Sequence, residues 1–134
     1  MTNLPLGATI GVLGGGQLGR MLSVAASRLG YKTHIFEPGA APAADVAHAV
    51  TTAAYDDTKA LTAFGKSVDV ITYEFENIPT SALDTLEALS QIHPNRRALA
   101  TSQDRITEKD FLTGLGLKTA PYANVESAAD LDAA

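Results

Sequence analysis

Residues Ile10–Met21 read IGVLGGGQLGRM, and this stretch decides the fold. A short apolar run ends in three glycines, Gly14, Gly16 and Gly19, and apolar residues at helical spacing follow at once. A strand, a glycine-rich turn and a helix in this order present backbone N–H groups and the positive helix end to an anionic or hydroxyl-rich ligand. The glycine spacing also matches the dinucleotide fingerprint. Taken alone, it favours an NAD(P)-binding Rossmann module of an oxidoreductase.

Composition limits the possible functions of the chain. Its 134 residues suit one domain with a sizeable core, and 46% of them are hydrophobic. A formal net charge of −5 argues against nucleic acid as a partner, because phosphate binding needs a clustered positive surface. The chain contains no cysteine, which excludes disulfides and thiolate chemistry. We also see no signal peptide or long apolar run and therefore expect a cytoplasmic protein without membrane contact.

Strand and helix signals alternate along the chain. The predicted strands are Ala8–Leu13, Lys32–Glu37, Ala47–Thr51, Val68–Tyr73 and Gln91–His93. The predicted helices are Gln17–Leu29, a short helix capped by Asp56 or Asp57, one with Pro79 in its first turn, Arg96–Ser102 and Asp104–Leu115. This alternation predicts an α/β, Rossmann-like fold, in which a parallel sheet has helices on both faces.

Apolar spacing predicts which side of each helix is buried. In the first helix the expected buried stripe is Leu18, Met21, Leu22, Ala25 and Leu29. In the helix after Pro79 it is Ala82, Leu83, Leu86 and Leu89. Residues 1–103 are expected to form this domain. Residues 104–134 read as the partial helical and linker segment of a next, truncated domain, because a new helix capped by Ser127 begins just before the chain stops.

A second motif, YEFENIP at Tyr73–Pro79, follows the fourth predicted strand. In an extended segment Glu74 and Glu76 share one side, and Phe75 faces the core. These carboxylates, with Asn77 beside them, suit sugar hydroxyls or an amine better than phosphate. Ordinary solvated glutamates remain the alternative. Because ligands bind outside the carboxyl ends of parallel strands, we expect both motifs at one edge of the sheet.

Three further features complete the candidate list. Glu37 lies 18 residues after Gly19, where a dinucleotide site places its ribose-binding acid. Arg105, at a predicted helix N-terminus, either meets an anion or is a harmless exposed cation. The three histidines, His34, His48 and His93, lack metal-ligand spacing, so no metal site and no catalytic group are assigned within this chain.

Three motifs in order carry a resemblance to a known family. They are Gly16–Met21, Tyr73–Asn77 and Asp104-Arg105 with Lys109 and Phe111. Together they resemble the N-terminal region of N5-carboxyaminoimidazole ribonucleotide synthetases, which belong to the ATP-grasp superfamily. The resemblance covers essentially the whole chain. Gln17 distinguishes it from the related ATP-dependent formylating enzymes for glycinamide ribonucleotide, which typically carry Glu there.

The resemblance implies a ligase of de novo purine (IMP) biosynthesis, in which 1–103 is a pre-ATP-grasp substrate-binding domain and 104–134 begins the ATP-grasp domain. Such enzymes join aminoimidazole ribonucleotide, bicarbonate and ATP to give the N5-carboxylated ribonucleotide, ADP and phosphate. It implies that Gly16, Gln17 and Leu18 meet the ribonucleotide and that Glu74, with Glu76 and Asn77 beside it, holds its ribose. Arg105 is implied to contact ATP.

The magnesium ligands and the rest of the ATP site are expected in the missing ATP-grasp domain. This chain alone is therefore expected to be catalytically incompetent, and a homodimer is an open expectation. Two alternatives stay open at this stage: the NAD(P)-binding module, and a noncatalytic interaction or regulatory domain that has kept the fold.

Overall fold

The computed structural model describes residues 3–134. The strands in this part are β1 (Thr9–Leu13), β2 (Lys32–Phe36), β3 (Ala49–Thr51) and β4 (Val70–Tyr73). The helices are α1 (Gln17–Arg28), α2 (Thr58–Lys66), α3 (Thr80–Leu86), α4 (Arg96–Gln103), α5 (Arg105–Gly114) and α6 (Ala128–Ala133). Apart from the strand expected at Gln91–His93, the predicted elements are confirmed in type and order, and their bounds differ by a few residues.

The sheet is parallel, with strand order β3-β2-β1-β4. The expected strand at Gln91–His93 is reduced to a single bridge between Ile71 and Ile92. Strands β2 and β3 lie on one side of β1, and β4 lies on its other side. The order in which strands are added to the sheet therefore reverses at the boundary between β1 and β4. In parallel α/β sheets the ligand crevice lies at such a switch point, at the carboxyl ends of the strands.

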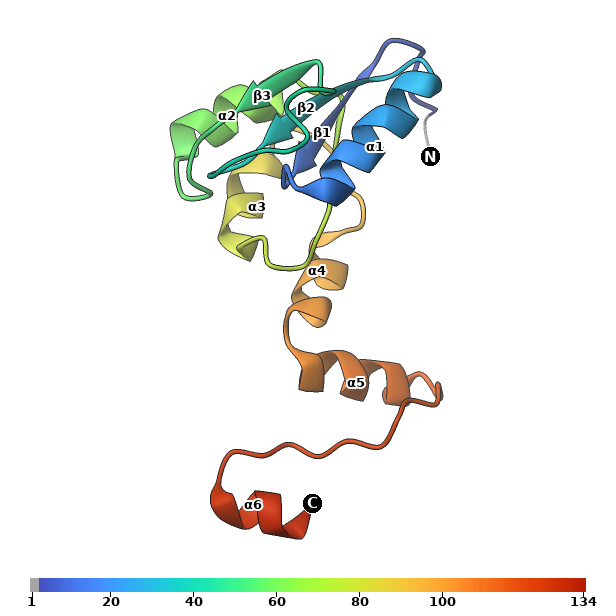
Figure 1. The fold of residues 1–134 in the computed structure, drawn as a ribbon, viewed down its shortest axis with the longest axis vertical. Coiled ribbons are helices and arrows are strands. Elements are labelled where there is room, and N and C mark those ends of the chain that lie inside the picture. The colour runs from blue at the N-terminus through green and yellow to red at the C-terminus, as the bar shows by residue number, and fades with distance from the viewer. Residues whose placement is uncertain (1–2) are drawn as a thin grey trace.

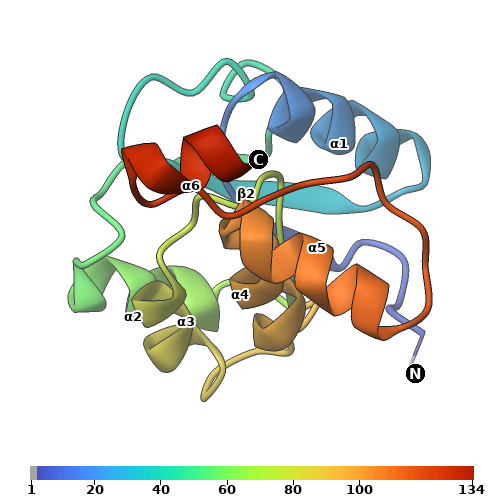
Figure 2. The ribbon, with the colours of Figure 1, turned by 90° about the horizontal axis from the view of Figure 1, so that it is seen from below.

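Helices cover both faces of the sheet, with α1 on one side and α2 and α3 on the other (Figure 1, Figure 2). Neighbouring residues of β1 show the two faces, since Val12 packs with Ile35 and Ala43 while Leu13 packs into the larger cluster under α2 and α3. The fully buried members of that cluster include Phe36, Leu61, Phe64, Ile71, Ile78, Leu83 and Leu86. Most of the apolar core therefore lies on the α2–α3 side.

The predicted buried stripe of α1 is wrong. Leu18, Met21 and Leu29 are 54%, 59% and 67% exposed, and Leu22 is exposed as well. The buried face consists of the small residues Gly19, Ser23 and Ala26 instead. Small side chains let α1 lie close against the sheet, and the Ser23 hydroxyl donates to the carbonyl of Gly19 at 2.8 Å, so it needs no other partner.

The helix after Pro79 also differs in one detail. Ala82, Leu83 and Leu86 are buried as predicted, but α3 ends at Leu86, and Leu89 beyond it is exposed. The prediction assumed that the helix continues through Leu89. Because α3 ends at Leu86, Leu89 does not share the buried face of the helix.

Helices α4 to α6 lead away from the sheet (Figure 1). Asn95, Asp104 and Ser127 cap α4, α5 and α6, each accepting a backbone N–H from the first turn, and the cap at Ser127 confirms the prediction from sequence. Helix α5 buries no residue, and residues 121–134 are all exposed. None of the helices within residues 3–134 is long and apolar enough to cross a membrane.

Replacing a buried leucine of α3 and an exposed leucine of α1 should have very different effects on the free energy of unfolding. We expect Leu83→Ala to lower the free energy of unfolding by about 2–5 kcal/mol, because Leu83 is fully buried between α3 and the sheet. Leu22→Ala, on the exposed side of α1, should change it by less than about 0.5 kcal/mol. Urea unfolding of both variants measures this, and a large loss for Leu22→Ala would contradict the observed orientation of α1.

Candidate functional site

The two sequence motifs meet at the carboxyl ends of β1 and β4, which we call the rim. Residues 14–16, the glycine loop, follow β1, and Glu74 follows β4. One carboxylate oxygen of Glu74 accepts the N–H of Gly16 at 2.8 Å, and the other accepts the N–H of Gly19. The Glu74 N–H donates to the carbonyl of Leu13 at 3.1 Å, which continues the pairing of β1 and β4 by one residue. The carboxylate therefore sits at the N-terminus of α1, where the helix dipole stabilises negative charge.

The glycines of the loop leave room for this carboxylate. A Cβ atom on Gly14 would lie 2.5 Å from the Glu74 Cγ, and one on Gly16 or Gly19 would lie 2.8 Å from a Glu74 oxygen. Gly14 also has a φ of +102°, which L side chains rarely adopt. All three glycines of the fingerprint are thus explained by an internal carboxylate.

Glu37 has a similar role on the other side of the loop. Its carboxylate accepts the N–H of Gly15 at 2.8 Å and that of Gly39 at 3.1 Å. The segment at 38–46 then folds over Gly15, whose carbonyl accepts the N–H of Ala43 at 3.0 Å. The Arg20 guanidinium ties this segment to α1 through the Pro42 carbonyl and Asp45. Glu37 is therefore used in holding the chain's own backbone.

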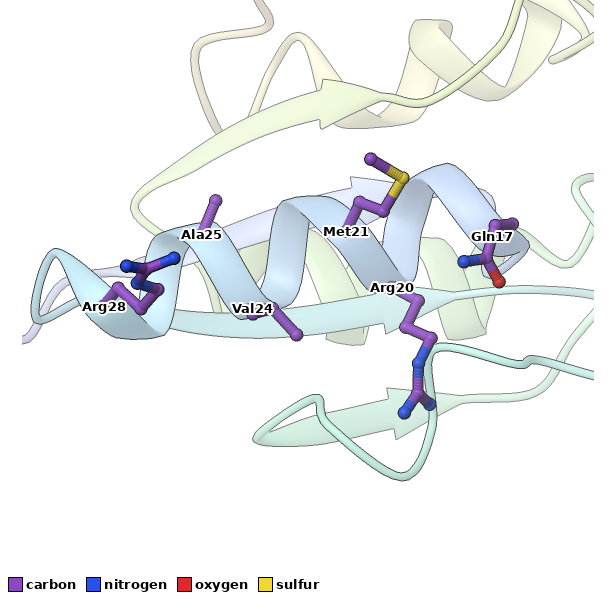
Figure 3. A pocket seen from close by; sticks show the side chains of 6 residues that line it. All are labelled: Gln17, Arg20, Met21, Val24, Ala25 and Arg28. Atoms are coloured by element: carbon purple, nitrogen blue, oxygen red, sulfur yellow. The ribbon is translucent and has the colours of Figure 1, made fainter.

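The remaining candidates around the loop are exposed. Gln17 and Leu18 form the first turn of α1, and Gln17 lines a hollow of about 290 Å³ along the outer side of that helix (Figure 3). Glu76 and Asn77 are exposed in the turn that joins β4 to α3. Gly16 is half-buried.

The prediction that Glu74 and Glu76 share one side of an extended strand is wrong. The backbone bends and turns from Glu74 onward, so the alternation of an extended segment does not apply. Glu74 reaches under the glycine loop, whereas Glu76 stays exposed, and Phe75 is only partly buried against the core.

The candidate ATP residue, Arg105, begins α5 and is exposed. Its guanidinium pairs with Glu108 one helical turn later. The side-chain amide of Gln103, two residues before Arg105, donates to the carbonyls of Glu76 at 2.9 Å and Ile78 at 2.6 Å. The end of α4 is therefore tied to the rim.

Helices α4 and α5 enclose a hollow of about 400 Å³. The Arg97 guanidinium lies over the Phe111 ring in this hollow, 5.4 Å from its centre. Among residues 3–134, no three or more acidic or histidine side chains gather into a group that could hold a metal ion. His34, which the sequence did not assign to metal, bonds Ser67 and Thr51 instead, at 2.8 Å each.

Tyr55 is a residue with an unusual environment that the sequence did not single out. It lies in the connection between β3 and α2, and its ring stacks on Phe36 with the centres 5.6 Å apart. Its hydroxyl oxygen is buried and has no hydrogen-bond partner. Burial, together with the charges of Glu37 and Glu74, raises the pKa of this hydroxyl well above its ordinary value. No local sequence pattern marks it, because its stacking partner Phe36 belongs to β2, far from it in sequence.

Known proteins similar to this chain indicate one kind of enzyme. The family model of the ribonucleotide synthetase preATP-grasp domain matches residues 7–103. The N5-carboxyaminoimidazole ribonucleotide synthase of Brucella melitensis is 54% identical over 134 residues, a match that covers 99% of this chain and 37% of that protein. The synthase of that name from Staphylococcus aureus is 44% identical over 132 residues, covering 98% of this chain and 35% of the relative.

Solved structures give the same result. The synthetase from Staphylococcus aureus complexed with ADP has a TM-score of 0.89 and 42% identity, covering 99% of this chain and 36% of that one. The synthase from Aspergillus clavatus, in complex with ADP and 5-aminoimidazole ribonucleotide, has a TM-score of 0.82 and 30% identity, covering 96% of this chain and 35% of that one. The chain spans little more than a third of the length of these relatives.

The alternative of an NAD(P)-binding oxidoreductase module is wrong. The relatives are ribonucleotide synthetases, and the amides that would hold a pyrophosphate are already bonded. Gly15 donates to Glu37, and Gly16 and Gly19 donate to Glu74.

Two helical glycines provide a matched test of the glycine–carboxylate contact. We expect Gly19→Ala to lower the free energy of unfolding by about 1–3 kcal/mol, because its Cβ would lie 2.8 Å from both Glu74 Oε2 and the Gly14 carbonyl oxygen. Gly114→Ala, at the end of α5 with no atom within 4 Å, should raise it by up to about 1 kcal/mol through helix propensity. Denaturant titrations of both variants decide the matter, and equal effects would contradict the crowding at Gly19.

Proposed function

We propose, because the chain belongs to the ribonucleotide synthetase preATP-grasp family, that it is the ribonucleotide-binding N-terminal part of an ATP-dependent ligase that carboxylates 5-aminoimidazole ribonucleotide. In this reaction bicarbonate attacks the terminal phosphate of ATP and releases ADP. The resulting carboxyphosphate gives up phosphate and carbon dioxide, and the amine of the ribonucleotide captures the carbon dioxide. The N5-carboxylated product belongs to de novo purine biosynthesis.

The observation that carries the proposal is the contact of Glu74 with the Gly16 and Gly19 amides. Each carboxylate oxygen holds one N–H and keeps a further lone pair as an acceptor. Ribose hydroxyls are donors that fit these free lone pairs. Gln17, Leu18, Glu76 and Asn77 lie exposed in the adjoining turns, where Gln17 and Asn77 supply amide donors and acceptors for the same ligand.

Charge favours the sugar end of the ribonucleotide at this position. Glu37 and Glu74 both hold the glycine loop, and Glu76 lies in the next turn. A phosphate placed here would be repelled by these carboxylates and would find the α1 N-terminus occupied. The 5′-phosphate is therefore assigned to cationic groups beyond the rim.

Arg105 is proposed to contact ATP. Its helix α5 begins two residues after Gln103, whose side chain bonds the carbonyls of Glu76 and Ile78. This link supports placing the ATP site beside the ribonucleotide site. We assign residues 1–103 to the substrate-binding domain and 104–134 to the start of the ATP-grasp domain.

The full activity is proposed only for a protein of the length of the relatives. Magnesium is assigned, from the family resemblance, to the part of the ATP-grasp domain that this chain does not contain. The chain alone is expected to be inactive. We also propose a cytoplasmic location. We propose a homodimer as well, because the exposed apolar side chains of α1 favour association with a second copy.

Activity should depend on the Glu74 carboxylate in a full-length synthetase that contains this chain. We expect ADP release that requires aminoimidazole ribonucleotide, and a loss of about 10- to 100-fold in kcat/KM for Glu74→Gln, because charge-assisted hydrogen bonds are worth about 1.5–3 kcal/mol. A coupled ADP assay measures both.

Asp69→Asn is the matched control for Glu74→Gln. Its carboxylate also accepts a backbone amide, from Thr9 at 2.8 Å, but it lies before β4 rather than after it. The kcat/KM of the Asp69→Asn variant should stay close to that of the parent protein. ADP release that does not depend on the ribonucleotide would refute the proposed function. Unchanged kinetics after both Glu74 and Glu76 are replaced by alanine would favour a noncatalytic domain.

A further inference from the structure

The turn at residues 75–78, which joins β4 to α3, has no backbone pairing of its own. Among the described residues, none of its N–H or C=O groups bonds to another backbone atom. The pairing with β1 ends at the Glu74 N–H, and the helical hydrogen bonds begin at the Pro79 carbonyl. Yet this turn carries Glu76 and Asn77, which the proposed function places at the ribonucleotide. A turn without pairing changes conformation easily unless another group holds it.

Gln103 supplies hydrogen bonds to this turn. Its side-chain Nε2 donates to the carbonyls of Glu76 at 2.9 Å and Ile78 at 2.6 Å. Both partners are carbonyl oxygens, which only accept, so the amide nitrogen rather than the amide oxygen has to face them. Within the described part of the chain, these are the side-chain hydrogen bonds that the backbone of the turn receives. Both protons of one amide are therefore used on the turn.

Apolar packing alone does not determine the shape of the turn. Ile78 is fully buried, and Phe75 is partly buried against the same core cluster. Glu76 and Asn77 lie between them and are exposed. The two flanking side chains fix the ends of the turn, whereas the direction of its exposed middle depends on the peptide groups. Two of these peptide carbonyls are the ones that Gln103 holds.

Gln103 is itself held in place, because it ends a helix that is fixed along its length. Leu99 of α4 is fully buried in the core cluster. At the start of α4, the Arg96 guanidinium pairs with Asp84 at 2.6 Å and with Glu87 at 3.0 Å, at the end of α3. The core therefore sets the position from which the Gln103 side chain reaches the turn.

We propose that Gln103 is a positioning residue of the ribonucleotide site, whose side-chain amide holds the 75–78 turn in the conformation in which Glu76 and Asn77 receive the ligand. This proposal rests on the proposed function. Because the turn is held before the ligand arrives, the ligand does not have to order it, and binding is stronger by the ordering free energy that is saved. Gln103 acts through the turn and makes no contact with the ligand or with the reacting atoms.

The test is Gln103→Met in a full-length synthetase that contains this chain. Methionine keeps the length and the helix propensity of glutamine but has no N–H to donate. We expect the KM for aminoimidazole ribonucleotide to rise about five- to tenfold, the effect of one hydrogen bond. The KM for ATP should change much less, because α5 keeps its own cap at Asp104. The melting temperature should stay close to that of the parent, because Leu99 and Arg96 still hold α4.

Two further variants separate a hydrogen-bonding role from a packing role. Gln91→Met is the matched control, because Gln91 is also exposed but lies beside Asp69 and Val70 at the start of β4, opposite the rim. Its KM for the ribonucleotide should equal that of the parent. Gln103→Asn keeps the amide but is one methylene shorter, so it should no longer reach the turn and should raise this KM as Gln103→Met does.

A measurement on this chain tests the contact without any ligand. The chain has three glutamines, Gln17, Gln91 and Gln103, and Gln17 and Gln91 are exposed. Because both amide protons of Gln103 are hydrogen-bonded, they should exchange with water more slowly than the side-chain amide protons of the other two. Nuclear magnetic resonance of the labelled chain measures these rates.

The outcomes separate this inference from the proposed function. If the parent synthetase responds to the ribonucleotide and Gln103→Met has the same KM for it, the inference is overturned and the proposed function stands. The inference is overturned in the same way if the Gln103 amide protons exchange as fast as those of Gln91. If ADP release by the parent does not depend on the ribonucleotide, the proposed function fails, and the positioning role of Gln103 fails with it.

Discussion

The structure of the rim depends on one carboxylate placed at the N-terminus of one helix. Glu74 accepts the N–H groups of Gly16 and Gly19 and so joins the end of β4 to the start of α1. These hydrogen bonds cross 58 and 55 residues of sequence, respectively. They satisfy amides that a helix leaves unpaired in its first turn, and they fix the glycine loop without a bound ligand. The fingerprint glycines follow from this contact, because side chains there would collide with the carboxylate.

The sequence predicted the order of strands and helices because short apolar runs ended by Gly or Pro are strong local signals. The sequence also predicted that both motifs lie at one edge of the sheet, since the carboxyl ends of parallel strands meet there. It failed on the buried side of α1, because apolar periodicity finds the apolar stripe of a helix, whereas close packing on a sheet requires small residues. Gly19, Ser23 and Ala26 themselves recur at helical spacing, and this was the signal available in the sequence.

The candidate site was predictable only in part. A glycine turn before a helix indicates backbone N–H groups that need acceptors. The local pattern does not predict whether the acceptor is a ligand or a distant side chain. Here the acceptors are Glu37 and Glu74, which lie beyond the end of α1 in sequence. Tyr55 was missed for the same reason, since its ring is held by Phe36 of β2 rather than by neighbours in sequence.

The same glycine spacing can serve opposite ligand chemistries, and the acceptor decides which. When the helix N-terminus is left open, it attracts phosphate; when a carboxylate fills it, the local charge is negative and the carboxylate keeps lone pairs that can accept further donors. Such a surface selects donors, namely sugar hydroxyls and amines, and disfavours anions. We propose that Glu74 in this way makes the rim suited to the sugar side of a ribonucleotide rather than to a phosphate.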